Sequence, residues 1–238
     1  CQIGIRACDM GEKGSLAVDA TVFSDYFTHS QYIALKTKDA IVDRFRDMEG
    51  ERPNVDLDHP TLRINIHIDR NICTVSLDSS GLSLHKRGYK VANTLAPINE
   101  VLAAGMILKA GWTGQSDFID PMCGGGTLLT EAAMIACNIP ANLNKEEFGF
   151  ETWPDFDVDL YEVIEEAALK KIKEFHFKIV GYDIDDITLK KAQENIVSAN
   201  LSEFISLEHC DFFETEKGRD RQLFLVFNPP YDERISID

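Results

Sequence analysis

Alternation of short apolar segments with helix-like segments, from Phe118 to Phe227, is the feature that most constrains the fold of this chain. The apolar segments have the length of buried strands, and the segments between them have helical spacing. Strands that alternate with helices form a parallel, doubly wound sheet, which binds ligands beyond the carboxyl ends of its strands. The predicted strands are Phe118–Asp120, Lys178–Tyr182, Phe204–His209 and Gln222–Phe227, and the predicted helices are Thr127–Cys137, Val158–Glu174 and Ile184–Ala199.

A smaller α+β unit is predicted before this domain. Leu16–Val22 alternates like a strand, and Gln31–Met48 has the spacing of an amphipathic helix. Arg63–Asp69 and Ile72–Leu77 alternate like two paired strands joined at Arg70–Asn71. A polar cluster near residues 78–81 predicts a boundary, which gives a first domain over residues 1–80 and a second over residues 81–238. A helix that begins near Pro97 leads into the second domain.

Composition limits the kinds of partner that the chain can bind. The 238 residues carry a formal net charge of −16, so a globally basic surface for nucleic acid is excluded and any phosphate contact must be local. No apolar run is long enough to span a bilayer, and the first residues do not resemble a secretory signal, so we expect a cytoplasmic protein without membrane partners. Reduced thiols are expected because the cysteines are scattered: Cys1, Cys8, Cys73, Cys123, Cys137 and Cys210.

A glycine-rich turn lies between the first predicted strand and helix of the second domain, in the sequence Asp120-Pro121-Met122-Cys123-Gly124-Gly125-Gly126-Thr127. Glycines let a backbone turn tightly and approach a ligand closely. No Gly-Lys-Ser/Thr follows, so this is not a loop for NTP phosphates. The turn alone does not separate a dinucleotide from an adenosyl ligand, and a purely structural turn is the simplest alternative.

Acidic side chains follow the next two predicted strands. Asp183 lies at a strand's carboxyl end, where its carboxylate can accept hydrogen bonds from both ribose hydroxyls of a nucleoside. Asp211 follows the next strand and can accept from an adenine amino group, with Phe212 packed on the ring. The alternatives are a solvated turn aspartate and a helix-capping Asp beside core aromatics. The order of glycine turn, ribose-type acid and adenine-type acid on successive strands favours a nucleoside cofactor.

The last predicted strand leads into Asn228-Pro229-Pro230-Tyr231. An exocyclic amine of a base is a poor nucleophile because its lone pair is delocalised into the ring. Accepting its two hydrogens on the Asn228 side-chain oxygen and the Pro229 carbonyl makes the nitrogen more pyramidal and nucleophilic, while Tyr231 stacks on the base for about 1–3 kcal/mol. Positioning and electrostatics then replace a strong general base. A merely proline-rich loop is the alternative.

Two other chemistries are less consistent with the sequence. Cys123 lies in the cofactor turn and not in the predicted substrate loop, so we do not expect a thiolate nucleophile. No metal site is predicted because the cysteines and histidines lack ligand spacing; the histidines are His29, His59, His67, His85, His176 and His209.

These residues together resemble a known family, the class I S-adenosylmethionine-dependent methyltransferases that carry an N-terminal THUMP domain and methylate guanine N2 in 23S ribosomal RNA. The resemblance covers nearly the whole chain. It includes Thr28-His29-Ser30-Gln31-Tyr32 and Gly50-Glu51-Arg52-Pro53 in the THUMP-like part, Leu84–Lys90 and Ala96-Pro97-Ile98-Asn99-Glu100 at the start of the catalytic domain, the glycine turn, and Phe148-Gly149-Phe150-Glu151.

The resemblance implies a Rossmann-like methyltransferase domain behind a THUMP-like RNA-binding domain, and it adds the Ala-Pro segment to the cofactor pocket. The predicted cofactor-binding residues are Thr94, Ala96, Pro97, Asp120, Pro121, Cys123, Gly124, Gly126, Thr127, Asp183, Ile184, Asp211 and Phe212. The predicted catalytic residues are Asn228, Pro229, Pro230 and Tyr231. RNA contacts are expected from Arg63, Arg70, Lys86 and Arg87.

Several alternatives remain open at this point. The same tetrapeptide suits a tRNA guanine-N2 or an adenine-N6 methyltransferase, because any planar exocyclic amine fits it. A non-catalytic RNA-binding module with this fold is a further alternative, and a nicotinamide-dependent oxidoreductase is disfavoured by the long spacing from the glycine turn to Asp183. Because the chain ends soon after Tyr231, we expect the complete fold to need further strands and helices.

Overall fold

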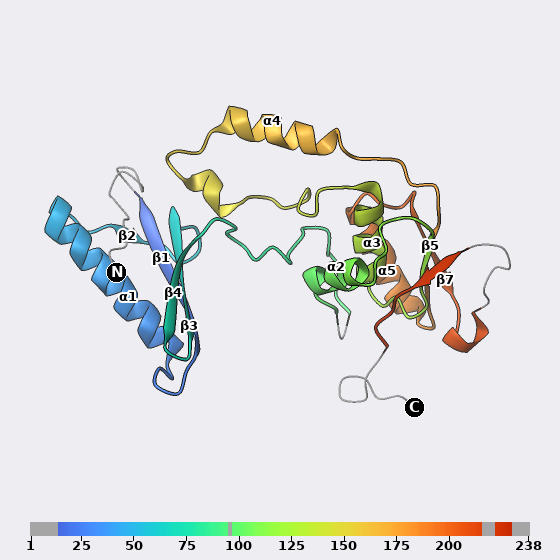
Figure 1. Cartoon of the computed structure of the whole chain (residues 1–238), viewed down its shortest axis with the longest axis horizontal. Coiled ribbons are helices and arrows are strands. Elements are labelled where there is room, and N and C mark those ends of the chain that lie inside the picture. Colours follow the sequence, from blue (N-terminus) through green and yellow to red (C-terminus); the bar gives the residue numbers. More distant parts are fainter. Residues whose placement is uncertain (1–13, 95–96, 216–221, 230–238) are drawn as a thin grey trace. The chain divides into compact units, whose positions relative to one another are not determined.

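A computed structural model of the chain describes residues 14–94, 97–215 and 222–229. These residues divide into two compact units, each with its own sheet (Figure 1). Unit 1 comprises the chain up to Ser83 together with Glu147–Val158, and unit 2 comprises Leu84–Glu146 and the chain from Asp159 onwards. The polypeptide therefore passes between the units at three places, after residues 83, 146 and 158. The predicted boundary at residue 80 remains a prediction, and no sequence pattern signalled the return of Glu147–Val158 to unit 1.

Unit 1 is a four-stranded sheet with one long helix. Its strands are β1 (Ser15–Phe23), β2 (Asn54–Val55), β3 (Leu62–Asp69) and β4 (Ile72–Asp78), in the order β2-β1-β3-β4. The predicted hairpin is confirmed: β3 and β4 are antiparallel, Asp69 pairs with Ile72, and Arg70 in the turn has φ 54°. Alternate residues of β3 are buried, and helix α1 (Ser30–Glu49) contributes Ile41, Val42 and Phe45 to the same core.

The segment that returns to unit 1 contains a short helix, η2 (Gly149–Thr152). It is fixed by hydrogen bonds from Phe150 N to Ser79 O at 3.1 Å and from Thr152 Oγ1 to Thr61 O at 3.0 Å. Trp153 packs against the core of unit 1. A side chain at Gly149 would place its Cβ 2.8 Å from Gly81 N, so this close approach of two backbones requires a glycine.

Unit 2 contains the predicted parallel sheet. Its strands are β5 (Asp117–Asp120), β6 (Ile179–Asp183), β7 (Ile205–His209) and β8 (Leu223–Leu225), in the order β7-β6-β5-β8 with every pairing parallel. The helices are α2 (Glu100–Lys109), α3 (Thr127–Cys137), α4 (Val158–Leu169) and α5 (Asp186–Ser198), with the short helix η3 at Phe212–Glu214. Helix α4 ends before the predicted Glu174 because the chain turns after Leu169, and Lys173 N then donates to Cys137 O.

The core of unit 2 forms where helices α3 and α5 bury their apolar side chains against the sheet. Helix α3 packs against β5 and β6 and is buried along almost its whole length, and α5 packs against β6 and β7. Trp112, Phe118, Leu129 and Ile196 are fully buried. None of the helices in the described ranges is long and apolar enough to cross a membrane.

The strand order of unit 2 reverses at β5. The chain proceeds from β5 to β6 and β7 on one side, and then returns to place β8 on the other side of β5. In open α/β sheets the crevice for ligands lies at the carboxyl ends of the strands where the order reverses. The segments that follow β5 and β8 are therefore the first place to examine for a functional site.

Candidate functional site

The predicted site segments converge on one edge of the unit 2 sheet. Ile119 of β5 pairs with Leu225 of β8, and Asp120 pairs with Gly181 of β6. The glycine turn after β5, Asp183 at the end of β6 and Asn228 beyond β8 consequently all lie at the carboxyl edge. The sequence order of the chain does not bring them together; the parallel register does.

The glycine turn is bound directly to the end of β6. Gly124 N donates to Asp183 Oδ2 at 2.9 Å, and Cys123 N donates to Tyr182 O at 2.8 Å. Gly124 and Gly126 have φ values of 53° and 76°, in the left-handed region that favours glycine. A Cβ on Gly126 would press against Ala192 at 3.3 Å, whereas a Cβ on Gly124 would meet nothing within 4 Å. The outer side of the turn at Gly124 is therefore open.

A nucleoside cofactor fits the groups present at this edge. The open side of Gly124 leaves the backbone accessible, as a bound adenosyl group requires. Each oxygen of Asp183 accepts one backbone N–H, from Gly124 and from Asp185. A carboxylate has about four acceptor positions, so Asp183 keeps capacity for ribose hydroxyls.

Asp120 differs from Asp183 in its environment. It is 1% exposed, and its Oδ1 accepts from Met122 N at 3.2 Å. Burial, with a smaller contribution from the nearby charge of Asp183, raises the pKa of this carboxyl group from 3.8 to about 7. Asp120 therefore fixes the start of the glycine turn from the interior, and direct contact between this side chain and a cofactor remains a prediction.

Asp211 and Phe212 lie after β7. Asp211 Oδ1 accepts from Phe213 N at 2.8 Å, which is the helix-capping arrangement considered as the alternative from sequence. The accompanying expectation of core aromatics is wrong for Phe213, which is 90% exposed. The ring of Phe212 lies 5.9 Å from that of Phe227 after β8. A role of Asp211 and Phe212 at an adenine ring stays a prediction, and so does that of the exposed Ile184.

Asn228 and Pro229 follow the end of β8 and are half-buried. Val226 N donates to Ile119 O at 3.2 Å, so the backbone stays beside β5 up to this point. Pro230, Tyr231 and Ala96, which the sequence also assigned to the site, lie outside the described residues.

Asn195 on α5 is a residue of this site that sequence reasoning missed. Its fully buried amide accepts from Val91 N and Ala92 N at 2.9 Å each, and it donates to Ala92 O and Gly125 O at 3.0 and 3.1 Å. The amide thus joins the segment before Thr94 to the glycine turn. The same contact brings the Thr94 methyl group to 3.2 Å from a Cβ built on Gly125. The only sequence signal was an asparagine inside a predicted helix, where this residue is usually unfavourable.

A second buried cluster attaches the same segment to α3. Glu131 accepts from Arg87 Nη2 at 3.3 Å and from the Tyr89 hydroxyl at 3.0 Å. Burial raises the pKa values of both Glu131 and Tyr89. Arg87 is 8% exposed and its guanidinium pairs with Glu131 inside unit 2, so its role as an RNA contact stays a prediction.

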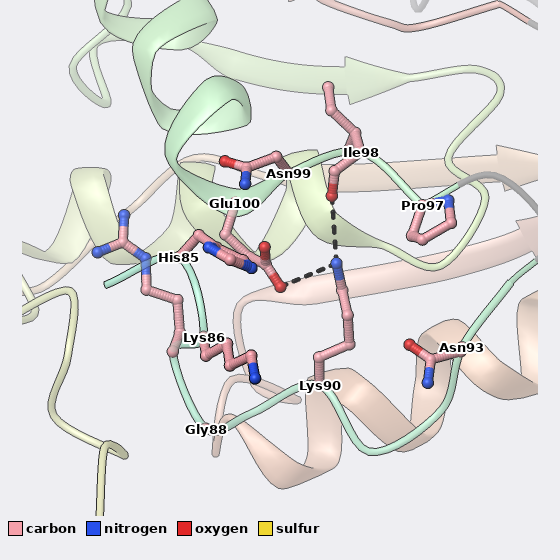
Figure 2. A pocket seen from close by; sticks show the side chains of 10 residues that line it. His85, Lys86, Gly88, Lys90, Asn93, Pro97, Ile98, Asn99 and Glu100 are labelled. Carbon is pink, nitrogen blue, oxygen red and sulfur yellow. Dashed lines mark hydrogen bonds and ion pairs between the residues drawn. The ribbon is translucent and has the colours of Figure 1, made fainter. Parts of the chain in front are cut away.

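The other predicted RNA contacts are distributed over both units. Arg63 in unit 1 is bound to Asp19 Oδ2 at 2.7 Å and to Leu57 O at 2.8 Å, and Arg70 is exposed in the hairpin turn. Lys86 in unit 2 is exposed and lines a cavity of about 480 Å³ (Figure 2). Pro97, one of the predicted cofactor residues, lines the same cavity.

Within the described residues, no arrangement of side chains suits a thiolate nucleophile or a metal site. Burial raises the pKa of the Cys123 thiol well above its usual range, which opposes a reactive thiolate. Within residues 14–94, 97–215 and 222–229, no group of three or more His, Cys, Asp or Glu side chains is placed to hold a metal ion.

Comparisons with known proteins agree with this geometry. Residues 87–237 match the RMKL-like methyltransferase domain, and residues 8–78 match the THUMP domain. The ribosomal RNA large subunit methyltransferases K/L of Syntrophotalea carbinolica and Desulfotalea psychrophila are 39% and 40% identical over 95% of this chain. The chain spans only about a third of those relatives, 33% and 32% of their lengths.

Solved structures show the same fold. SMU.472, crystallised in complex with SAH, superposes with a TM-score of 0.82 at 30% identity, covering 95% of this chain and 60% of that one. A protein from Clostridium difficile 630, described as a possible methylase, gives a TM-score of 0.83 at 34% identity over 95% of this chain and 59% of that one. The fold is therefore Rossmann-like. With a matching domain model over more than half of its residues, the chain belongs to the RMKL-like methyltransferase domain family and joins that domain to a THUMP domain.

Proposed function

We propose that this chain binds S-adenosyl-L-methionine and transfers its methyl group to the exocyclic N2 amine of a guanine in large-subunit (23S) ribosomal RNA. One observation carries the proposal: the parallel register places the glycine turn, bound to Asp183, and the Asn228–Pro229 segment at the same sheet edge. A cofactor turn and an amine-binding loop on adjacent strands are what a direct methyl transfer requires.

The glycine turn and the acids would hold the cofactor. Gly124 offers an open backbone, Asp183 has free acceptor positions for ribose hydroxyls, and Asp211 keeps Oδ2 for the adenine amino group. The remaining predicted contacts are Thr94, Ala96, Pro97, Pro121, Cys123, Gly126, Thr127, Ile184 and Phe212. When bound, the cofactor supplies an electrophilic methyl group on a sulfonium.

Asn228 and Pro229 would act on the amine. Two acceptors, the Asn228 side-chain oxygen and the Pro229 carbonyl, orient the nitrogen and favour its pyramidal form. Tyr231 would stack on the base. The proton becomes acidic only after the methyl group arrives, so no side chain needs to act as a strong base.

The choice of ribosomal RNA is supported by the relatives. The proteins with 39% and 40% identity are named ribosomal RNA large subunit methyltransferases, and unit 1 contains most of the THUMP match. A chain with charge −16 needs such a separate unit, with a locally suitable surface, to bind RNA.

The test is the Asn228→Ala variant of the chain. We expect methyl transfer to fall by at least ~10²-fold, because a positioned transition-state contact is lost, while affinity for S-adenosyl-L-methionine stays within ~2-fold. Calorimetry would measure cofactor binding, and nucleoside mass spectrometry of treated ribosomal RNA would measure the product. Loss of both activities together would show that the loop is wrongly assigned.

A second candidate is methylation of adenine N6. A Listeria monocytogenes protein described as a predicted N6-adenine-specific DNA methylase superposes with a TM-score of 0.81 at 28% identity. The N6 amine of adenine carries two hydrogens like the N2 amine of guanine, so Asn228 and Pro229 suit either amine equally. Mass spectrometry of treated ribosomal RNA, tRNA and DNA separates the candidates, and N6-methyladenine as the only product would contradict the guanine assignment.

A further inference from the structure

We propose that the cavity lined by residues 85–93 and 97–100 is a subsite for a phosphate group of the RNA strand next to the target nucleotide, with Lys86 as its main contact. The proposal rests on the proposed function, since it takes RNA as the substrate. It adds a place where the strand is held, separate from the amine-binding loop at Asn228.

The cavity has the size and lining of a ligand site. Its volume of about 480 Å³ lies within the range of roughly 300–1,000 Å³ that is usual for small-molecule pockets. Figure 2 shows the side chains that line it, which come from residues 85–93 and 97–100. Lys90 connects these two stretches, because its ammonium donates to Ile98 O at 3.2 Å and forms an ion pair with Glu100 at 2.9 Å.

The charges around the cavity favour an anion. Lys90 is neutralised by Glu100 and Arg87 by Glu131, whereas Lys86 is exposed and forms no ion pair in the part of the chain that the structure describes. The lining therefore has a net positive charge on a chain of charge −16. Phosphate groups are bound by such local cations.

The cavity adjoins the cofactor turn through one short connection. Asn93 lines the cavity, and the next residue, Thr94, lies so near Gly125 of the turn that a Cβ there would come 3.2 Å from its methyl group. Asn195 fixes Val91 and Ala92 to that same turn. The cavity is therefore joined to the cofactor turn, which lies at the same sheet edge as the segment after β8.

The experiment compares Lys86→Ala and Lys86→Arg with a control, Lys190→Ala, which removes an exposed lysine of α5. Binding of a ribosomal RNA fragment is measured at several salt concentrations, together with affinity for S-adenosyl-L-methionine. We expect Lys86→Ala to weaken RNA binding by ~5–10-fold and to reduce the salt slope by about 1, as for loss of one phosphate contact. Cofactor affinity should be unchanged, and Lys86→Arg should restore RNA binding.

Three outcomes would overturn the proposal. Lys86→Ala could match Lys190→Ala in both affinity and salt slope, or it could weaken cofactor binding as much as RNA binding. As a third outcome, the wild-type chain could bind inorganic phosphate in a way that depends on Lys86, while RNA binding does not change in Lys86→Ala. The cavity would then be a site for free phosphate and not for RNA. The assay measures RNA binding and not methylation. A wild-type chain that methylates no guanine would therefore contradict the proposed function, while the effect of Lys86→Ala on RNA binding would still test the phosphate subsite.

Discussion

Two buried polar clusters hold the same segment, residues 87–92, against the core of unit 2, and they do so with different chemistry. Asn195 is neutral, and its side-chain amide forms four hydrogen bonds with backbone groups. The cluster of Arg87, Tyr89 and Glu131 is charged and leaves Arg87 Nε without an acceptor among the described residues. A satisfied amide fixes geometry, whereas a buried ion pair brings a large desolvation cost and depends on both partners.

The two clusters also end in different places. Asn195 reaches Gly125, so its hydrogen bonds connect the segment to the cofactor turn itself. Glu131 belongs to α3, so the charged cluster connects the segment to the interior helix behind that turn. We therefore expect the charged cluster to dominate stability and the neutral cluster to dominate cofactor binding.

The largest expected effect is on the charged cluster. Glu131→Ala leaves the Arg87 guanidinium buried without its carboxylate and should lower the free energy of unfolding of unit 2 by about 3–5 kcal/mol. Urea denaturation followed by Trp112 fluorescence measures it, in a Trp153→Phe background because Trp153 belongs to unit 1. Glu166→Ala is the control: it breaks an exposed pair with Lys170 and should cost less than about 0.5 kcal/mol.

Replacing both partners tests the cause of that loss. The double variant Arg87→Met, Glu131→Leu should recover most of the stability, because no ion then remains buried. Equal losses in Glu131→Ala and Glu166→Ala would show that the buried pair contributes no more than an exposed one.

Asp120 extends the comparison to a buried carboxyl group that accepts a hydrogen bond from Met122 N. Its folded pKa of about 7 lies above the ordinary 3.8, so the folded chain binds this proton more tightly than the unfolded chain. The stability that it contributes is fully present below pH ~4 and is lost as the pH rises to ~7. The full shift corresponds to roughly 4 kcal/mol.

Asp120→Asn keeps an acceptor for Met122 N and removes the ionisation. The variant should lose little stability between pH 4 and 8, whereas the wild type should lose several kcal/mol, of the size given above, over the same window. Urea midpoints across this range, with cofactor absent, provide the measurement. Parallel pH profiles for the two proteins would contradict the assignment to Asp120.

The smallest expected change in stability is in the neutral cluster. There the loss of affinity for S-adenosyl-L-methionine should exceed the loss caused by changes in the charged cluster. Asn195→Ala removes the amide without burying a charge and should cost about 1–3 kcal/mol, because the backbone groups of Val91, Ala92 and Gly125 lose its hydrogen bonds. Affinity for S-adenosyl-L-methionine should fall by ~10-fold because Gly125 is released. Glu131→Gln is the matched comparison, and an equal loss of cofactor affinity there would remove the distinction between the clusters.

Much of unit 2 could be predicted from the sequence because its signals are local. The strands have apolar runs, the turn has three glycines, and Asp183 directly follows its strand, so each feature is visible within a few residues. The parallel register then brings these segments to one edge, a consequence of the strand–helix alternation and not of any single residue.

The missed features depend on contacts between distant segments. Asn195 and Glu131 act on residues about 100 and 40 positions earlier in the chain, and hydrogen bonds at that separation leave no periodic pattern. The sequence placed Arg87 in a local basic patch for RNA and gave no sign that its side chain is buried. Its burial follows from Glu131 on a helix that is otherwise rich in Leu and Ala.

The return of Glu147–Val158 to unit 1 has a consequence for the order in which the protein can mature on the ribosome. Unit 1 needs Trp153 for its core and Thr152 for its contact with Thr61, yet these residues are synthesised only after β5 and α3 of unit 2. Domains generally fold as they emerge, amino-terminal first. Here unit 1 cannot complete its core until Glu147–Val158 has been synthesised, and by then much of unit 2 has already been made. The two units therefore acquire their native cores during overlapping stages of translation.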